Sequence, residues 1–136
     1  DWVREARQRP LPFELVRFAI ADADREQSRE FIARRFETML TQGLVAEVEA
    51  LYRRGDVRSD LPSMRAVGYR QVWDYLDGQT GYDEMRDRAV TATRQLAKRQ
   101  MTWLRAAPEL TWFDSRAPGL GEQVLNFLAS APINWP

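Results

Sequence analysis

The sequence has 136 residues, with 20 acidic and 20 basic side chains, so its formal net charge is zero. It contains no cysteine, which excludes disulfides and thiolate metal sites. It also contains no histidine, which removes the commonest metal ligand and the usual general base at neutral pH. No stretch approaches the roughly 18 apolar residues of a membrane span, and the first residues do not form a signal peptide. We therefore expect one globular domain in the cytoplasm that makes no membrane contact.

The first half of the chain predicts one strand and two helices. Residues 1–12 are polar and are expected to be a linker from an upstream segment. Phe13 to Ala21 is apolar and rich in strand-forming residues, so we predict a buried strand. Asp22 and Asp24 offer N-caps for a helix that begins near Arg25. Gly43 interrupts this helix, and the apolar pattern predicts a second one from Leu44 to Gly55.

The second half predicts three helices and a second strand. A helical pattern runs from about Ala66 to Leu76, and the longest runs from Asp83 to Arg105, before Pro108. The apolar stripe of this long helix is expected to contain Met85, Ala89, Ala92, Leu96 and Trp103. A short strand is predicted from Leu110 to Phe113, and a last helix from Gly121 to Leu128.

Two strands separated by some ninety residues of helix cannot form a tight hairpin, and two strands are too few for a stable sheet. We expect both to join a parallel sheet whose other strands lie in an upstream segment. The predicted fold class is therefore α/β, mostly helical in this part.

The first candidate site is the segment RAVGYR, at residues 65–70. Arginine binds phosphate through two parallel hydrogen bonds, glycine lets a backbone approach closely, and tyrosine can stack on a base. The structural alternative is an ordinary helix N-terminus, with Tyr69 in the core and both arginines in solvent.

The second candidate site is the segment KRQMTWLR, at residues 98–105. Arg88, Arg94, Lys98, Arg99 and Arg105 follow one another with no acid among them, and such a helix face suits a phosphate backbone. The alternative is a solvated basic surface that complements the helix dipole. Trp103 is expected to belong to the apolar stripe.

Weaker candidates are three aspartates (Asp56, Asp60 and Asp74) and two tryptophans (Trp112 and Trp135). Capping and turns explain Asp56 and Asp60, and Trp112 lies in an apparent core strand. The sequence contains no glycine-rich phosphate loop and no convincing catalytic base.

Two long motifs resemble the C-terminal third of tRNA dimethylallyltransferases, which are IPP transferases. They are DLPSMRAVGYRQVWDYLDG at residues 60–78 and ATRQLAKRQMTWLR at residues 92–105, followed by WFDS at residues 112–115. The resemblance implies a parallel-sheet core like that of P-loop kinases, of which residues 13–136 would be the C-terminal portion. The phosphate-loop half is expected upstream.

The resemblance also implies an activity. These enzymes use Mg²⁺ and transfer the dimethylallyl group of dimethylallyl diphosphate to the exocyclic amine of the adenosine 3′-adjacent to the tRNA anticodon. The adenine is flipped out of the anticodon loop. The metal ligands and the catalytic residue are expected upstream, so this chain alone is expected to be an inactive monomer that binds the anticodon stem-loop.

The family's tRNA-contacting residues fall on both motifs of this chain. They correspond to Arg65, Ala66, Val67, Gly68, Tyr69, Arg70, Lys98, Arg99, Gln100, Met101, Thr102, Trp103, Leu104 and Arg105. Arg35 matches a family arginine that faces the diphosphate. The chain departs from the family at Phe31, where other members often carry arginine, which puts diphosphate affinity in doubt unless Arg34 substitutes.

Two other hypotheses remain open from the residues themselves. The chain could be a non-catalytic helical RNA-binding module, because everything identifiable in it holds anions. It could also be a protein-interaction domain whose basic face is incidental. A phosphate-loop motif upstream would favour the enzyme.

Overall fold

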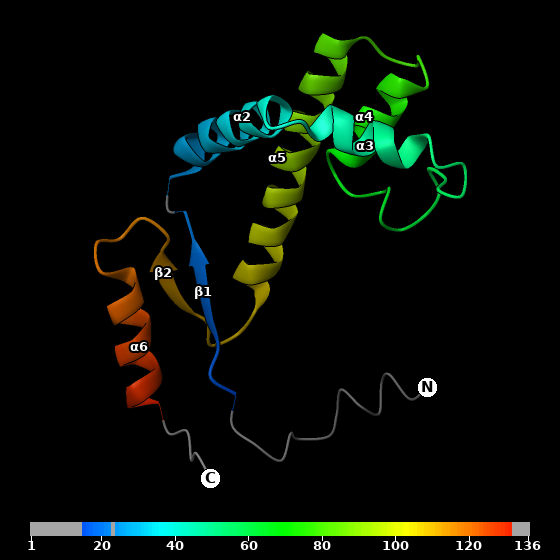
Figure 1. Ribbon diagram of the computed structural model, residues 1–136. Helices are drawn as coiled ribbons and strands as arrows, with labels where there is room; N and C mark the ends of the chain where they lie inside the picture. The colour runs from blue at the N-terminus through cyan, green and yellow to red at the C-terminus, as the bar shows by residue number, and fades with distance from the viewer. Residues whose placement is uncertain (1–14, 23, 132–136) are drawn as a thin grey trace, which may run out of the picture. The chain divides into compact units, whose positions relative to one another are not determined.

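The computed structural model describes residues 15–22 and 24–131, and the chain divides into two units (Figure 1). One unit is the helical segment Asp24–Ala106. The other combines the two ends of the chain, Asp1–Ala23 and Ala107–Pro136. The predicted linker at residues 1–12, the start of the predicted first strand and Trp135 lie outside the described residues.

The unit formed by the chain ends is a pair of parallel strands with one helix. Strand β1 (Phe18–Ala21) pairs with β2 (Thr111–Asp114), with Phe18 opposite Thr111. Helix α6 (Leu120–Ser130) contributes Phe127, whose ring meets Phe18 and Phe113 edge-on at centroid distances of 6.0 and 5.5 Å. The prediction that both strands belong to a parallel sheet is confirmed.

The predicted limits of the strands were less accurate. Residues 15–17 of the predicted first strand are not part of β1, because the partner strand β2 is only four residues long. Beyond the paired residues, the two chain segments are joined by an ion pair in which Arg116 donates to Asp22 at 2.7 Å. The side chain of Asp22, one of two predicted helix caps, is therefore engaged with Arg116.

The helical unit contains α2 (Arg25–Thr41), α3 (Leu44–Tyr52), α4 (Tyr69–Leu76) and α5 (Tyr82–Ala106). The Asp24 carboxylate caps α2 by accepting hydrogen bonds from the backbone N–H groups of Glu26 and Gln27, at 2.8 and 3.2 Å. This cap confirms the predicted start of the helix. Helix α5 packs against α2 and α4, and α3 packs against α2 and α4.

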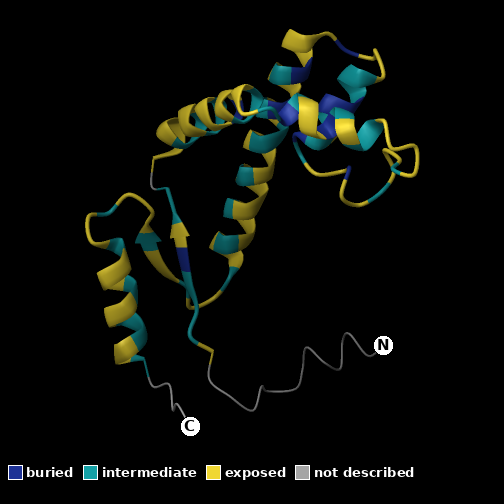
Figure 2. Cartoon of the chain, viewed as in Figure 1, coloured by how far each residue is buried: buried dark blue, intermediate teal, exposed yellow. Residues whose placement is uncertain are grey.

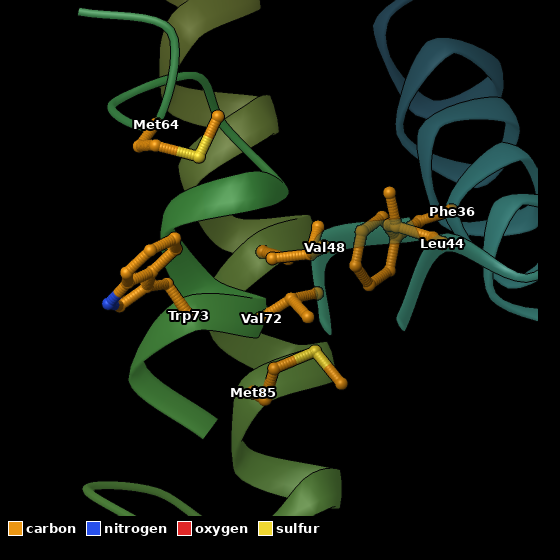
Figure 3. Packing of buried hydrophobic residues seen from close by; sticks show 8 residues of the cluster. Phe36, Leu44, Val48, Met64, Val72, Trp73 and Met85 are labelled. Carbon is orange, nitrogen blue, oxygen red and sulfur yellow. The ribbon is translucent and has the colours of Figure 1, made fainter. Parts of the chain in front are cut away.

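The apolar core of the helical unit lies where all four helices meet (Figure 3). Its buried members come from every helix and from the loop before α4: Phe36, Leu44, Val48, Met64, Val72, Trp73, Met85 and Ala89. Burial of these side chains is the main force that holds the unit together. None of the described helices is both long and apolar enough to cross a membrane.

The core involves only the first part of α5. Met85 and Ala89 are fully buried, and no later residue of the helix is buried (Figure 2). Leu96 and Trp103, which were predicted to continue the apolar stripe, are not part of the core, because Leu96 is 37% exposed and Trp103 is 77% exposed. The other helices of the unit bury α5 only near its start, so the second half of the stripe lies uncovered.

Candidate functional site

The first candidate segment, residues 65–70, is a turn that leads into α4. The helix begins at Tyr69 and not near Ala66 as predicted, because Gly68 has a φ of 99° and a ψ of −60°, a conformation incompatible with helix. Just before the segment, the buried side chain of Met64 anchors the loop to the core. The segment is therefore held firmly at both of its ends.

Gly68 has a conformational role. It is buried, and a Cβ added to it would lie 3.8 Å from Cε2 of Phe36, which is ordinary contact, so the positive φ is what requires glycine. Its backbone N–H donates a hydrogen bond of 2.8 Å to Oε1 of Gln71, which satisfies one of the free donors at the helix start. This environment favours the structural interpretation of Gly68.

Tyr69 also has a structural environment. Its ring packs against the core, and its hydroxyl donates a hydrogen bond to the Glu47 carboxylate of α3. This hydrogen bond, followed by burial and the negative charge of Glu47, raises the pKa of Tyr69 above its ordinary value of 10.0. The alternative that placed Tyr69 in the core thus fits this residue, and Val67 is likewise half-buried.

Arg65, Ala66 and Arg70 are the exposed residues of the first segment. Within the described residues, neither arginine side chain forms an ion pair or a hydrogen bond. Arg65 is close enough to Asp60 to lower the pKa of that carboxyl slightly, although the hydrogen bond from Arg58 has the largest effect. The two guanidinium groups therefore remain available to an external anion.

Six other arginines of the helical unit are paired with acids of the same chain, whereas Arg25, Arg34, Arg35 and Arg94 form no ion pair within the described residues. The pairs are Arg29–Glu26, Arg53–Glu49, Arg54–Asp56, Arg58–Asp60, Arg86–Glu37, Arg86–Asp87 and Arg88–Glu84. Hydrogen bonds from Arg54 and Arg58 lower the pKa values of Asp56 and Asp60, respectively. These hydrogen bonds from arginine, more than a helix cap or a turn, explain the role of the two aspartates.

The second candidate segment, residues 98–105, lies on the uncovered half of α5. Lys98, Arg99 and Arg105 are exposed and form no side-chain ion pair or hydrogen bond within the described part of the chain. Arg88 was predicted to belong to this unpaired basic run but forms an ion pair of 2.6 Å with Glu84, one turn earlier. Arg94 reaches the backbone carbonyl of Arg29 at 3.5 Å.

The remaining residues of this segment differ in exposure. Gln100, Thr102 and Trp103 are exposed, and Met101 and Leu104 are half-buried. The Thr102 hydroxyl donates a hydrogen bond of 3.0 Å to the carbonyl of Lys98. An open depression of about 280 Å³ is lined by Gln95, Lys98, Arg99, Thr102 and Trp103. Sequence periodicity missed the exposure of this tryptophan beside two unpaired cations.

Arg35 is exposed on α2, one turn after Phe31, whose side chain is 52% exposed. The four-residue spacing places the two on one face of the helix. The described residues contain no group of three or more acidic side chains that could hold a metal ion. Any contact of Arg35 with a diphosphate stays a prediction.

Comparison with known proteins identifies the family. Residues 1–107 match the family model described as IPP transferase. The chain belongs to the IPP transferase family. The resemblance found in the two motifs is thereby confirmed.

Two crystal structures of IPP transferase relatives share the fold. The full-length tRNA isopentenylpyrophosphate transferase from Bacillus halodurans is 33% identical, with a TM-score of 0.79 over 93% of this chain. The tRNA delta(2)-isopentenylpyrophosphate transferase from Staphylococcus epidermidis is 26% identical, with a TM-score of 0.71 over 82% of this chain.

The chain spans 42% and 37% of the lengths of these two relatives. Its mostly helical fold with a small parallel sheet matches the C-terminal part of the IPP transferase fold, as predicted. The relatives therefore establish the family and the fold of this part of an IPP transferase.

Proposed function

We propose that this chain is the C-terminal part of the catalytic core of a tRNA dimethylallyltransferase. The enzyme would transfer the dimethylallyl group of dimethylallyl diphosphate, with Mg²⁺, to the exocyclic amine of the adenosine 3′-adjacent to the anticodon. The proposed contribution of this chain is to bind the anticodon stem-loop. We assign the transfer chemistry to no residue of this chain.

Family membership supports the transferase activity, since both relatives are described as tRNA isopentenylpyrophosphate transferases. The distribution of charge supports the binding role and is the observation on which that role rests. Arg65, Arg70, Lys98, Arg99 and Arg105 are exposed and lack acidic partners within residues 15–22 and 24–131, whereas six other arginines of the helical unit are paired with acids. Arg25, Arg34 and Arg35 of α2 are also exposed and without an acidic partner there, but lie outside the two candidate segments.

Unpaired guanidinium and ammonium groups can replace the counterions that surround an RNA backbone. Arginines already held by carboxylates are less able to do so, because phosphate must compete with an existing partner. These five cations of the two candidate segments are therefore the proposed phosphate-binding groups. They also explain how a chain with zero net charge can bind a polyanion, because the local charge decides.

The test compares two double substitutions that remove the same net charge. Arg65→Gln with Lys98→Gln removes one proposed phosphate-binding group from each segment, and Arg53→Gln with Arg58→Gln removes two arginines that are paired with acids. Binding of a labelled anticodon stem-loop is measured over a range of salt concentrations. In the first variant, the slope of log affinity against log salt should fall by about 0.7 to 0.9 for each phosphate that is no longer neutralised.

The paired-arginine variant should keep the slope of the unmodified chain. An equal fall in both variants would mean that net charge alone drives binding and would contradict the assignment of the phosphate-binding groups. Salt-independent or absent binding by the unmodified chain would contradict the RNA-binding role itself and favour the protein-interaction hypothesis.

A further inference from the structure

Helices α3 and α4 are joined by two side-chain hydrogen bonds that run in opposite directions. At one end of α4, the Tyr69 hydroxyl donates to the Glu47 carboxylate of α3. At the other end, the Tyr52 hydroxyl of α3 donates to Oδ1 of Asp77, the C-cap of α4, at 2.8 Å. These hydrogen bonds raise the pKa of each tyrosine above 10.0, so both hydroxyls remain donors at neutral pH. The start and the end of α4 are therefore each fastened to α3.

The two hydrogen bonds act at different places relative to the proposed phosphate-binding arginines. Tyr69 is the first residue of α4, immediately before Arg70 and four residues after Arg65. The backbone N–H of Arg70 donates to the carbonyl of Ala66 at 3.1 Å, so the two arginines share one turn. Asp77 lies at the opposite end of the helix. Only the hydrogen bond of Tyr69 therefore acts where the arginines are attached.

Apolar packing and this hydrogen bond restrain the start of α4 in different ways. Val48 of α3 and Val72 of α4 are buried in the same core cluster (Figure 3). Their burial holds the helices together, but the hydrophobic effect is non-directional. A hydrogen bond weakens steeply when its angle is lost, so it restrains direction as well as distance. The Glu47 carboxylate therefore fixes the direction of Tyr69 and, with it, the first turn of α4.

We infer that Glu47 is a positioning residue for RNA binding, because its hydrogen bond to Tyr69 orients the turn that presents Arg65 and Arg70 to phosphates. This inference rests on the proposed function, since it takes the two arginines as phosphate-binding groups. Arginine binds phosphate through two parallel hydrogen bonds, so the guanidinium must be presented in a defined orientation. A group that holds such a side chain in place affects affinity without touching the ligand.

The negative charge of Glu47 offers an alternative role. A carboxylate beside a phosphate-binding turn repels RNA, so charge alone predicts tighter binding when Glu47 is neutralised. The positioning role predicts weaker binding when the acceptor of the Tyr69 hydroxyl is lost. The two interpretations thus predict changes of opposite sign for Glu47→Ala.

The experiment uses the full chain and the labelled anticodon stem-loop, with binding measured over a range of salt concentrations. Glu47→Ala should weaken binding on the order of fivefold, the scale of a single hydrogen bond. Its slope of log affinity against log salt should also fall, because fewer phosphates are neutralised. Glu47→Gln should restore most of the binding, because its amide oxygen can still accept from Tyr69. Asp77→Ala is the matched control: it changes the net charge equally, removes the hydrogen bond of Tyr52, and should bind like the unmodified chain.

Tyr69→Phe removes the same hydrogen bond as Glu47→Ala and should weaken binding to the same extent. It provides the test if Glu47→Ala does not fold, and circular dichroism shows which variants are folded. Equal affinities of Tyr69→Phe and Asp77→Ala would show that the hydrogen bond only stabilises the fold, and would overturn the inference. Tighter binding by Glu47→Ala would also overturn it. In both cases the proposed function stands, whereas absence of binding by the unmodified chain would contradict the proposed function itself.

Discussion

The two candidate segments, residues 65–70 and 98–105, differ in how far they are built into the fold. In the first, Gly68 is buried and Tyr69 packs against the core, and only Arg65, Ala66 and Arg70 are exposed. In the second, no side chain is buried. A motif can therefore combine residues that hold a backbone in place with residues that meet a ligand.

The difference has a consequence for mutagenesis. A substitution in the middle of the first segment should change stability before it changes binding, whereas one in the second should leave stability almost untouched. A loss of tRNA binding on mutation of Gly68 or Tyr69 would therefore not show that either residue touches tRNA. Stability measurements at matched positions separate the two segments.

The largest effect is expected at Gly68. Gly68→Ala should lower the free energy of unfolding by about 1 to 3 kcal/mol, because a φ of 99° is strained for any residue with a Cβ. Gly81→Ala is the matched control, since Gly81 has no positive φ and open space around its Cβ position. Urea unfolding of the two variants measures the difference, and equal stability would mean that the turn before α4 is less constrained than described.

A smaller effect is expected at Tyr69. Tyr69→Phe removes the hydrogen bond to Glu47 and should cost about 1 kcal/mol at neutral pH. Tyr75→Phe is the control, because no hydrogen bond of its hydroxyl is found among the described residues, and it should cost less. Urea unfolding of both variants at pH 7 measures the two costs, and equal costs would contradict a stabilising role for the Tyr69 hydroxyl.

The same variant predicts a pH dependence. The pKa of Tyr69 is raised in the folded chain, so its contribution is complete below its ordinary pKa of 10.0 and is lost as pH rises through the raised value. The stability gap between Tyr69→Phe and the unmodified chain should therefore shrink above about pH 10. Urea unfolding at pH values on both sides of this point tests the prediction, and a gap that widened would contradict the assigned hydrogen bond.

The smallest effect is expected in the second segment. Thr102→Ala should change stability by less than about 0.5 kcal/mol, because the side chain is exposed and bonds only to its own helix. Thr93→Ala removes the same kind of bond, from Thr93 to the carbonyl of Ala89, at a half-buried position of α5 and should cost more. A larger loss for Thr102→Ala than for Thr93→Ala would break the contrast between the segments.

Local sequence signals predicted much of this fold. The cap at Asp24, the interruption at Gly43 and the extent of α5 follow from residue types that act within one or two helical turns. The parallel sheet that contains β1 and β2 was predicted from the long helical stretch that separates them, which rules out a tight hairpin, but their direct pairing was not. The start of α4 was missed because the sequence does not reveal which glycine adopts a positive φ.

The candidate site was harder to predict, because exposure depends on what other elements cover. Periodicity placed Trp103 in the apolar stripe but did not show that it is exposed, because the stripe of α5 is longer than the helices that pack on it. The pairing of Arg88 with Glu84 was missed because the acid lies one turn before the basic run. Both errors concern which other residues contact a given side chain, and a pattern of residue types does not specify those contacts.

The parallel pairing of β1 with β2 also has a consequence for the order of folding. In the sequence, one strand precedes and the other follows the helical unit Asp24–Ala106. The residues of the ion pair that joins the ends of the strands, Asp22 and Arg116, are 94 positions apart. The helices form through interactions between residues closer in sequence, and such interactions form earlier than long-range strand pairing. We therefore expect the helices to fold first and the sheet last. The backbone amide protons of the two strands should then exchange with solvent faster than those of the helices.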